Sequence, residues 1–166
     1  MRIFWRCFFI QGSWNFKAML GVGFAFAAIP IAQRLYQDKN AMEAFLARHL
    51  VFFNSHPYLA SVCLGACAHL EEEANNKNIA QEDEHKMAVF KERLIGPLGA
   101  LGDEIFWKSV KPFCSALAVL CGIIFGWIAI PIFLITFNIP HLYVRLKGLL
   151  LGNKLGFDIV NLLSMR

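Results

Sequence analysis

The sequence predicts an all-α integral membrane protein with one clear transmembrane helix plus short, broken or re-entrant helical segments. Three observations support this fold class. Hydrophobic residues make up 57% of the chain and charged residues only 17%, too few charges to cover the surface of a soluble domain. The 16 phenylalanines and 4 tryptophans suit a lipid boundary and its interfaces. The stretch from Phe113 to Phe137 contains no charged residue.

That uncharged stretch is long enough to cross a bilayer as one helix. Roughly 25 residues that rise about 1.5 Å each exceed a hydrocarbon core of about 30 Å. Pro131 predicts a kink, and Asn138 with Pro140 predicts the end of the helix. Small residues recur at every fourth position, at Ala118, Gly122 and Gly126. Such a stripe allows close approach of another helix, from a partner or from the segments upstream.

The remaining segments are shorter and less regular. We expect a single domain over residues 1–166: an interfacial N-terminal segment (1–17), broken helical segments (18–112) with an acidic loop (71–84), the transmembrane helix (113–137) and a C-terminal segment (138–166). Glycine, proline or polar residues interrupt the apolar stretches Ala18–Gln33 and Leu50–Leu70. This pattern is typical of re-entrant hairpins and unwound transporter helices, and equally of helices on the membrane surface.

Charges flank the predicted span without indicating its orientation. Lys108 and Lys111 precede it, whereas Arg145, Lys147 and Lys154 follow it, so the positive-inside rule favours neither direction. The acidic loop 71–84 is expected to face water. The net charge of +4 is compatible with anionic lipid headgroups, and no basic-aromatic pattern indicates nucleic acid.

No motif indicates a self-contained active site. The sequence lacks a GxxxxGK phosphate loop, a GxSxG elbow and an HExxH metal motif. Cys63 and Cys67 lie near His69, but no fourth ligand is evident, so buried thiols are favoured over a metal site. We therefore expect no metal and no cofactor.

Three polar groups of residues adjoin apolar stretches and are candidates for binding a hydroxylated ligand. The first is the segment Phe52–Tyr58, in which proline after histidine favours extended backbone. The second is the carboxylate run Glu71–Glu73 at the end of an apolar helix. The third is Gly96–Glu104, where three glycines and a proline predict a tight turn that opens a helix with Asp103 near its N-terminus. The candidate substrate-binding residues are Asn54, His56, Glu72, Asp103 and Trp107. For each, capping, backbone hydrogen bonding or interface packing is the structural alternative.

In order along the chain, these segments resemble a known membrane family. The matching blocks are FFIQGSWNF (8–16), GFAFAAIP (23–30), FFNSHPYLA (52–60), LEEE (70–73), GPLGALGDEIFW (96–107), KPF (111–113) and FNIPHLYVR (137–145). Together they resemble the IID component of the mannose/fructose/sorbose family of the bacterial phosphoenolpyruvate-dependent sugar phosphotransferase system, over nearly the whole chain.

The resemblance implies a non-phosphorylated subunit in the bacterial inner (cytoplasmic) membrane. Its implied partners are a IIC membrane subunit, the IIA and IIB phosphocarrier proteins, a hexose and the lipid bilayer, in a homo-oligomeric assembly of IIC–IID pairs. IIC and IID would share the sugar path, while phosphate reaches the sugar through IIA and IIB.

Two departures from the family pattern leave an alternative open. Family members continue beyond Arg166, so a C-terminal membrane segment is expected to be missing, and Glu104 stands where the family has a small residue. The alternative is a shortened IID relative that acts as a regulatory or scaffolding membrane protein without transport.

Overall fold

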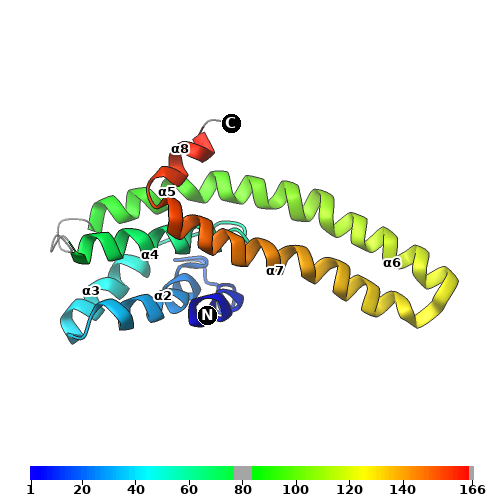
Figure 1. Ribbon diagram of the computed structural model, residues 1–166, viewed down its shortest axis with the longest axis horizontal. Coiled ribbons are helices and arrows are strands. Elements are labelled where there is room, and N and C mark those ends of the chain that lie inside the picture. The colour runs from blue at the N-terminus through cyan, green and yellow to red at the C-terminus, as the bar shows by residue number, and fades with distance from the viewer. Residues whose placement is uncertain (77–83, 165–166) are drawn as a thin grey trace.

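The computed structural model describes residues 1–76 and 84–164, where the regular elements are helices. They are α1 (Arg2–Arg6), η1 (Cys7–Phe9), α2 (Gly21–Leu35), α3 (Lys39–His49), α4 (Ala60–Asn76), α5 (Glu84–Gly102), η2 (Asp103–Val110), α6 (Lys111–Phe125), η3 (Gly126–Ile128), α7 (Ala129–Leu155) and α8 (Asp158–Ser164). Figure 1 shows a helical body from which α6 and the first half of α7 project as a long arm. The predicted all-α fold class is confirmed.

The predicted span is helical and apolar, but it reverses direction at the tip of the arm. The helical segment Lys86–Leu155 is long and apolar enough to cross a membrane, and its most apolar window is not buried within the chain. Gly126 has φ +62°, a conformation that side chains disfavour, and there α6 ends and the chain turns through η3 into α7 (Figure 1). Residues 113–137 thus form the end of an α-helical hairpin.

The proline and small-residue predictions for this stretch need correction. Pro131 lies in the first turn of α7. Backbone amides there have no hydrogen-bond partner within the helix, so a proline in this turn does not kink it. Asn138 and Pro140 do not end the helix, which continues to Leu155 because its second half packs against α4. Within the small-residue stripe, Gly122 faces Ala129 of the same hairpin: a Cβ at Gly122 would lie 3.3 Å from the Cβ of Ala129. This close approach is therefore intramolecular.

The turn predicted at Gly96–Glu104 is also wrong. Helix α5 runs through Pro97 to Gly102 and continues into a π-helix, η2, without a break. Leu94, Leu98 and Phe106 are buried along this path. Their burial outweighs the turn preference of the glycines and the proline, since local propensity is a weak constraint compared with tertiary packing.

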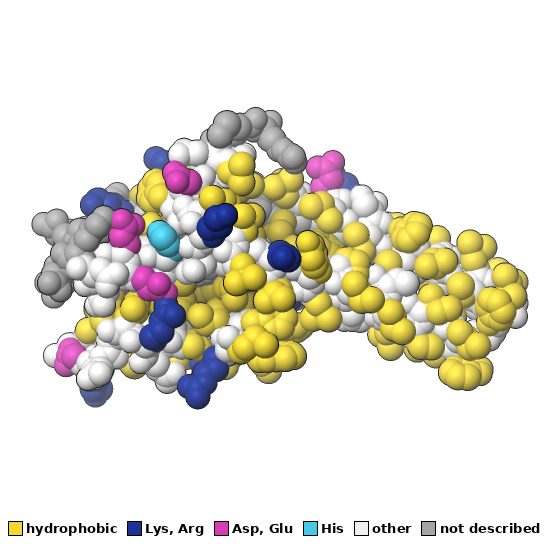
Figure 2. All heavy atoms as spheres, viewed as in Figure 1, with side chains coloured by type: hydrophobic (Ala, Val, Ile, Leu, Met, Phe, Trp, Pro, Cys, Tyr) yellow, Lys and Arg dark blue, Asp and Glu magenta, His cyan; other side chains and the backbone are white. Residues whose placement is uncertain are grey.

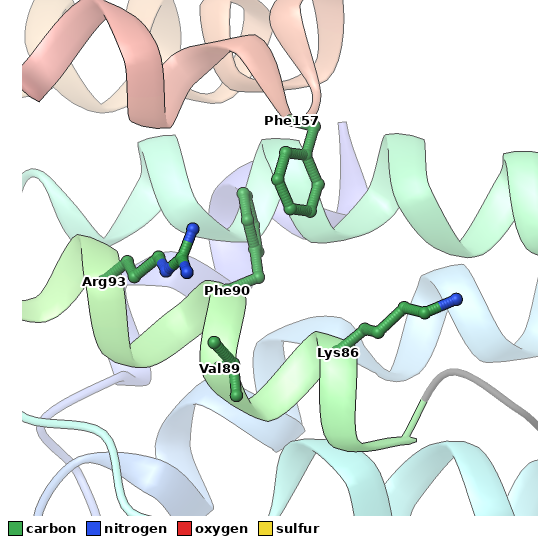
Figure 3. A pocket seen from close by; sticks show the side chains of 5 residues that line it. All are labelled: Lys86, Val89, Phe90, Arg93 and Phe157. Carbon is green, nitrogen blue, oxygen red and sulfur yellow. The ribbon is translucent and has the colours of Figure 1, made fainter.

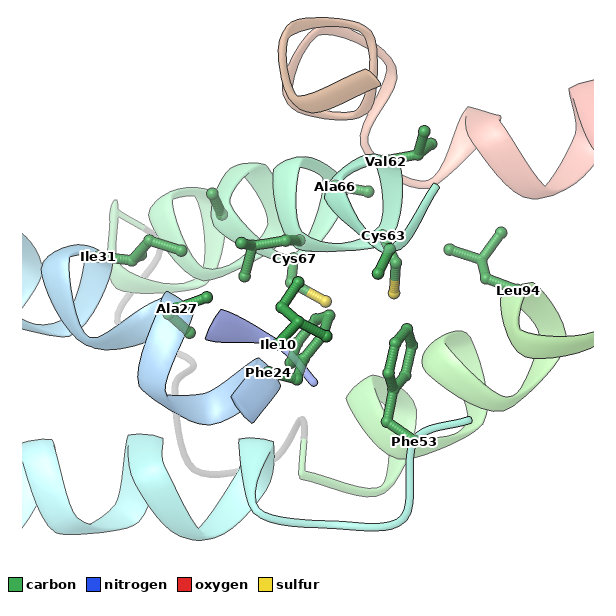
Figure 4. Packing of buried hydrophobic residues seen from close by; sticks show 14 of the residues in the cluster. Ile10, Phe24, Ala27, Ile31, Phe53, Val62, Cys63, Ala66, Cys67 and Leu94 are labelled. Atoms are coloured by element: carbon green, nitrogen blue, oxygen red, sulfur yellow. The ribbon is translucent and has the colours of Figure 1, made fainter. Parts of the chain in front are cut away.

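The body is held together by close helix contacts around α4. Figure 4 shows Cys63 and Cys67 of α4 packed among Phe24, Phe53 and Leu94, which confirms the prediction of buried thiols. Helices α4 and α7 touch through backbone where they carry glycine. A Cβ at Gly65 would overlap the carbonyl of Leu149; in the same way, one at Gly152 would overlap that of Val62, and one at Gly148 would crowd Ser61.

The interruption predicted in Leu50–Leu70 is confirmed. The chain is not helical between the end of α3 and Ala60. The amide of Phe53 donates to Ala18 at 3.2 Å and its carbonyl accepts from Leu20 at 2.8 Å. These bonds satisfy backbone groups that a buried loop would otherwise leave unpaired, and they hold the following residues, His56 to Tyr58, against the body.

The acidic stretch 71–84 is only partly a loop. Residues 71–76 form the last turns of α4, and residues 77–83 lie outside the described residues. Glu71 is buried, contrary to the expectation that the whole stretch faces water, because its carboxylate binds buried cationic and hydroxyl groups of the body.

Candidate functional site

Residues from three separate segments form a largely buried aromatic and basic cluster at the base of the arm. This group, here called the His56 cluster, contains His56, Tyr58, Phe106, Trp107, His141 and Arg145. The His56 ring stacks on Phe106 with centroids 5.3 Å apart and lies 5.4 Å from Trp107. The Tyr58 ring stacks on His141 at 4.7 Å. The loop before α4, the π-helix η2 and the middle of α7 therefore meet here.

Glycine and the π-helix explain how these segments fit together. A Cβ at Gly102 would overlap the side chain of His56, so only glycine allows His56 to reach the end of α5. The wider turns of η2 begin at the next residue, Asp103. Single π-helical turns within α-helices are often found at functional sites.

Arg145 carries a buried charge that has no carboxylate partner in the described part of the chain. Its side chain donates from Nη1 to the carbonyl of Cys7 at 2.6 Å, and its guanidinium lies over the rings of Phe8 and Tyr58 at 4.8 and 4.9 Å. Among the described residues, no carboxylate lies within ion-pair distance of it, and its Nε has no hydrogen-bond partner. A buried cation in this state is costly, which favours binding of an additional acceptor.

Two histidines of the cluster also have unused polar atoms. The amide of Tyr58 donates to His56 Nδ1 at 3.3 Å, so in the neutral ring the hydrogen is on Nε2, which has no acceptor within the described chain. Asn138 Oδ1 lies 2.8 Å from His141 Nε2 and can only accept, which leaves Nδ1 of the neutral ring as an unused acceptor. The cluster therefore offers two donors and one acceptor.

The structure brings together three of the five predicted site residues. His56 and Trp107 are in contact, and Asp103 lies one turn before Trp107, next to the glycine that faces His56. Asn54 is on the same loop as His56 but is exposed. Glu72 lies elsewhere, paired with Arg34 of α2.

Sequence reasoning missed Tyr58, His141 and Arg145 as members of one site. The last two are spaced four residues apart, which places them on one face of a helix. This signal could have been used, but the helix was expected to end before them, at Asn138–Pro140.

A second buried cluster is centred on Glu71. Its carboxylate accepts from Tyr36 Oη at 3.0 Å and from Arg48 at 3.1 and 2.9 Å, and it lies 3.2 Å from His49 Nε2. Lys91 Nζ donates to the carbonyl of Arg48 at 2.6 Å. This Glu71 cluster therefore links α2, α3, α4 and α5.

Burial and the contacts within this cluster shift the pKa values of its titratable groups. Burial alone would raise the pKa of Glu71, but hydrogen bonds from His49 and Arg48 and the charges of these two residues lower it to about 2. Burial lowers the pKa of His49 to about 4, although its hydrogen bond to Glu71 acts in the opposite direction. Burial and the neighbouring charge of Glu71 raise the pKa of Tyr36 to about 12.

Away from both clusters, α5 and the segment before α8 form a shallow, mostly apolar pocket. Figure 3 shows the side chains that line it. They are Lys86, Val89, Phe90, Arg93 and Phe157, around a volume of about 260 Å³. The pocket holds none of the predicted site residues, and it has few polar atoms with which to orient a small hydrophilic ligand.

Comparison with known proteins links this architecture to one family. The model of the mannose/fructose/sorbose family IID component of the PTS matches residues 1–166. The chain is 38% identical over 159 residues to the mannose-specific EIID component of Escherichia coli K12, covering 95% of this chain and 56% of that protein. It is 35% identical over 160 residues to the fructose permease IID component of Bacillus subtilis, covering 95% and 57%. The chain thus spans little more than half the length of these relatives.

Solved structures show the same fold. A chain in the cryo-EM structure of the mannose transporter ManYZ with microcin E492 superposes with a TM-score of 0.87 at 37% identity, covering 96% of this chain and 58% of that one. A second chain, described as a membrane protein, gives a TM-score of 0.89 at 36% identity and covers 98% and 59%.

Proposed function

Because the chain belongs to the IID components of the mannose/fructose/sorbose family of phosphotransferase systems, we propose that it is a membrane subunit for phosphorylating hexose uptake. With a IIC subunit it would form the sugar path in the bacterial inner membrane. The partner is supported by the similarity to a chain of the mannose transporter ManYZ. In this proposal the phosphoryl group comes from IIA and IIB proteins.

The chemistry of the His56 cluster carries the proposal. A sugar hydroxyl both donates and accepts hydrogen bonds. Within the described residues, the cluster has unused donors at His56 Nε2 and Arg145 Nε and an unused acceptor at His141 Nδ1. Trp107, about two-fifths exposed, supplies an apolar ring surface at the edge of the cluster. The three polar atoms are closed to solvent, so sugar entry requires movement of neighbouring side chains.

The predicted site residues take different roles in this proposal. His56 donates to a sugar hydroxyl, Trp107 stacks against the sugar ring, and Asp103 accepts hydroxyl hydrogens from the exposed side of η2. Asn54 contributes from the rim of the loop. Glu72 is engaged by Arg34, so its predicted sugar contact would require that pair to open.

Three of the five histidines are buried, which argues against these three as phosphorylation sites. His49, His56 and His141 are at most 7% exposed, and a protein phosphoryl donor cannot approach rings that are closed to solvent. The phosphorylated histidines would belong to IIA and IIB.

Hexose uptake by cells that contain the complete set of partner subunits tests the proposal. Deletion of this chain is expected to abolish phosphorylating uptake of a hexose, and Asp103→Ala to lower uptake far more than the amount of chain in the membrane. Equal loss of both quantities would make Asp103 structural. Full uptake of every tested hexose after deletion would overturn the transport proposal and favour a regulatory or scaffolding role.

A further inference from the structure

We propose that the arm enters and leaves the bilayer through the cytoplasmic face, and that a belt of lysines and aromatic residues at its base binds anionic lipid headgroups there. The belt consists of Trp107, Lys108, Lys111, Tyr143 and Lys147. This inference concerns the membrane orientation of the chain and its lipid partner, and it rests on the membrane subunit proposed above.

The arm beyond the belt has the surface of a lipid-embedded element. Residues 112–144 include no Asp, Glu, Lys or Arg, and large apolar side chains such as Ile123 and Trp127 are each 77% exposed. Figure 2 shows this face of the arm covered by hydrophobic side chains, whereas charged side chains gather over the body. An exposed apolar surface of this extent requires a partner.

Belt residues on the two helices of the arm lie at matching distances from its tip. Lys111 and Tyr143 are equally far along the chain from the tip residue Trp127, at about 24 Å for helical rise. Trp107 and Lys147 are also equally far from it, at about 30 Å. The larger of these distances matches the thickness of a hydrocarbon core, about 30 Å. With the belt in one interface, Trp127 reaches the other, where tryptophan is enriched.

Within the belt, each of the two helical segments pairs a lysine with the aromatic ring four residues before it. Lys111 Nζ lies 4.9 Å from the centre of the Trp107 ring, and Lys147 Nζ lies 5.9 Å from that of Tyr143. All four residues are exposed. Both ammonium groups therefore lie between about 24 and 30 Å from the tip, where they can contact lipid phosphates.

The hairpin also resolves the orientation that charge counting along the sequence left open. In a single crossing, Lys108 and Lys111 would lie on one side of the membrane and Lys147 and Lys154 on the other. The turn at Gly126 places all four lysines on the same side, with an uncharged tip opposite. The positive-inside rule counts lysine and arginine near the ends of a span, so it now assigns the base to the cytoplasm.

Other charges near the base leave this assignment unchanged. Asp103 and Glu104 lie further from the tip than the belt, on the body side, and acidic residues contribute little to the rule. Arg145 is buried against Cys7, so it is not counted as a lipid contact.

Cysteine labelling in membrane vesicles that contain the full complex tests the orientation. Trp127→Cys, Lys111→Cys and Lys147→Cys are each combined with Cys121→Ala, because Cys121 is the native thiol that is partly exposed. In right-side-out vesicles, a membrane-impermeant maleimide should label position 127 and neither lysine position; in inverted vesicles the pattern should reverse. Labelling of positions 111 and 147 from opposite faces, or of both from outside, would overturn the inference.

This outcome can be told apart from failure of the proposed function. A chain that does not enter the membrane fraction at all would contradict the membrane subunit, whereas a chain that is inserted with the wrong labelling pattern contradicts only the orientation.

Lipid preference tests the belt. The complex is purified from membranes of mixed phosphatidylglycerol and phosphatidylethanolamine, and the bound lipids are quantified. Lys111→Gln and Lys147→Gln should each lower the preference for phosphatidylglycerol, by about fivefold per lysine when bound at an anionic surface. Lys39→Gln, an exposed lysine on α3, is the matched control and should change nothing. An unchanged preference in the double belt variant would overturn the lipid contact.

Discussion

Arg48 and Arg145 are both almost fully buried, at 7% and 4% exposure, but their surroundings differ. Arg48 shares two hydrogen bonds with the carboxylate of Glu71, whereas Arg145 has a backbone carbonyl and two aromatic rings. In the first cluster the guanidinium is paired with a carboxylate of the same chain, as expected of a structural brace. Among the described residues, the second leaves three buried polar atoms without a partner, at His56, His141 and Arg145, whereas the first leaves one, His49 Nδ1; the larger number is expected of a site that binds something else. This contrast can be tested by removing one group from each cluster.

The largest loss of stability is expected for Glu71→Ala. Removal of the carboxylate leaves Arg48 buried without its partner, which typically costs about 3–5 kcal/mol. Thermal unfolding of the detergent-solubilised complex measures the effect. Glu72→Ala is the matched control, because its pair with Arg34 is partly exposed and such pairs contribute about 1 kcal/mol or less. Similar losses for both variants would show that Glu71 is not a brace.

A smaller loss is expected for Gly102→Ala, which would force a methyl group into the side chain of His56. Overpacking of this kind costs about 1–3 kcal/mol, and hexose uptake should fall because His56 is displaced. Gly96→Ala in the same helix is the control, since a Cβ there meets nothing within 4 Å and alanine favours the helix by up to about 1 kcal/mol. If both variants behaved alike, the His56 contact would not matter.

Acid should weaken the Glu71 cluster through His49. The folded pKa of His49 is lowered to about 4 from 6.5, so below pH 6.5 the unfolded state binds a proton that the folded state does not. Stability is complete above pH 6.5 and falls as the pH drops towards 4, by about 2 kcal/mol at pH 5.

Glu71 acts at lower pH in the same direction. Its folded pKa of about 2 lies below 4.5, so its contribution is complete above pH 4.5 and is lost as the pH falls towards 2. Unfolding midpoints measured from pH 7 to 4 check both statements. His49→Gln should reduce the slope of the curve between pH 6.5 and 5, and an unchanged slope would contradict the assignment.

The smallest effect on stability is expected for Arg145→Met. The substitution removes one hydrogen bond and two ring contacts, worth about 1 kcal/mol each, but also an unpaired buried charge. The net change in unfolding free energy should be within about 1 kcal/mol, while hexose uptake is lost. A destabilisation as large as that of Glu71→Ala would mean that the His56 cluster is a brace as well.

Most of the fold class and the family could be predicted without coordinates. An uncharged apolar stretch, a low charge content and the order of blocks such as FFNSHPYLA (52–60) are properties of the linear chain. The comparisons confirm the family assignment. The interruption after α3 was also predictable, because His56-Pro57 disfavours a helix wherever it lies. The roles of the individual site residues remain predictions.

The site was predictable only in part, because its members come from distant segments. His56 and Trp107 were selected by residue type and lie together. Glu71 was assigned to the water-facing loop because it stands in an acidic run, and no local signal separates it from Glu72 and Glu73. What distinguishes Glu71 is that three residues surround its carboxylate: Tyr36, just after α2, and Arg48 and His49 of α3.

The path of the arm shows most clearly what tertiary structure decided. Hydropathy measures the cost of placing residues in water and is the same for one long helix and for two helices joined by a turn. The uncharged stretch 112–144 would reach about 50 Å as one helix, longer than one crossing needs. This excess length is the one feature of the sequence that indicates a hairpin. The turn at Gly126 and the continuation of α7 through Pro140 depend on packing, against Ala129 at the tip and through Gly148 and Gly152 at α4. Those contacts join residues far apart in the chain, and so the sides on which the lysines lie follow from the fold.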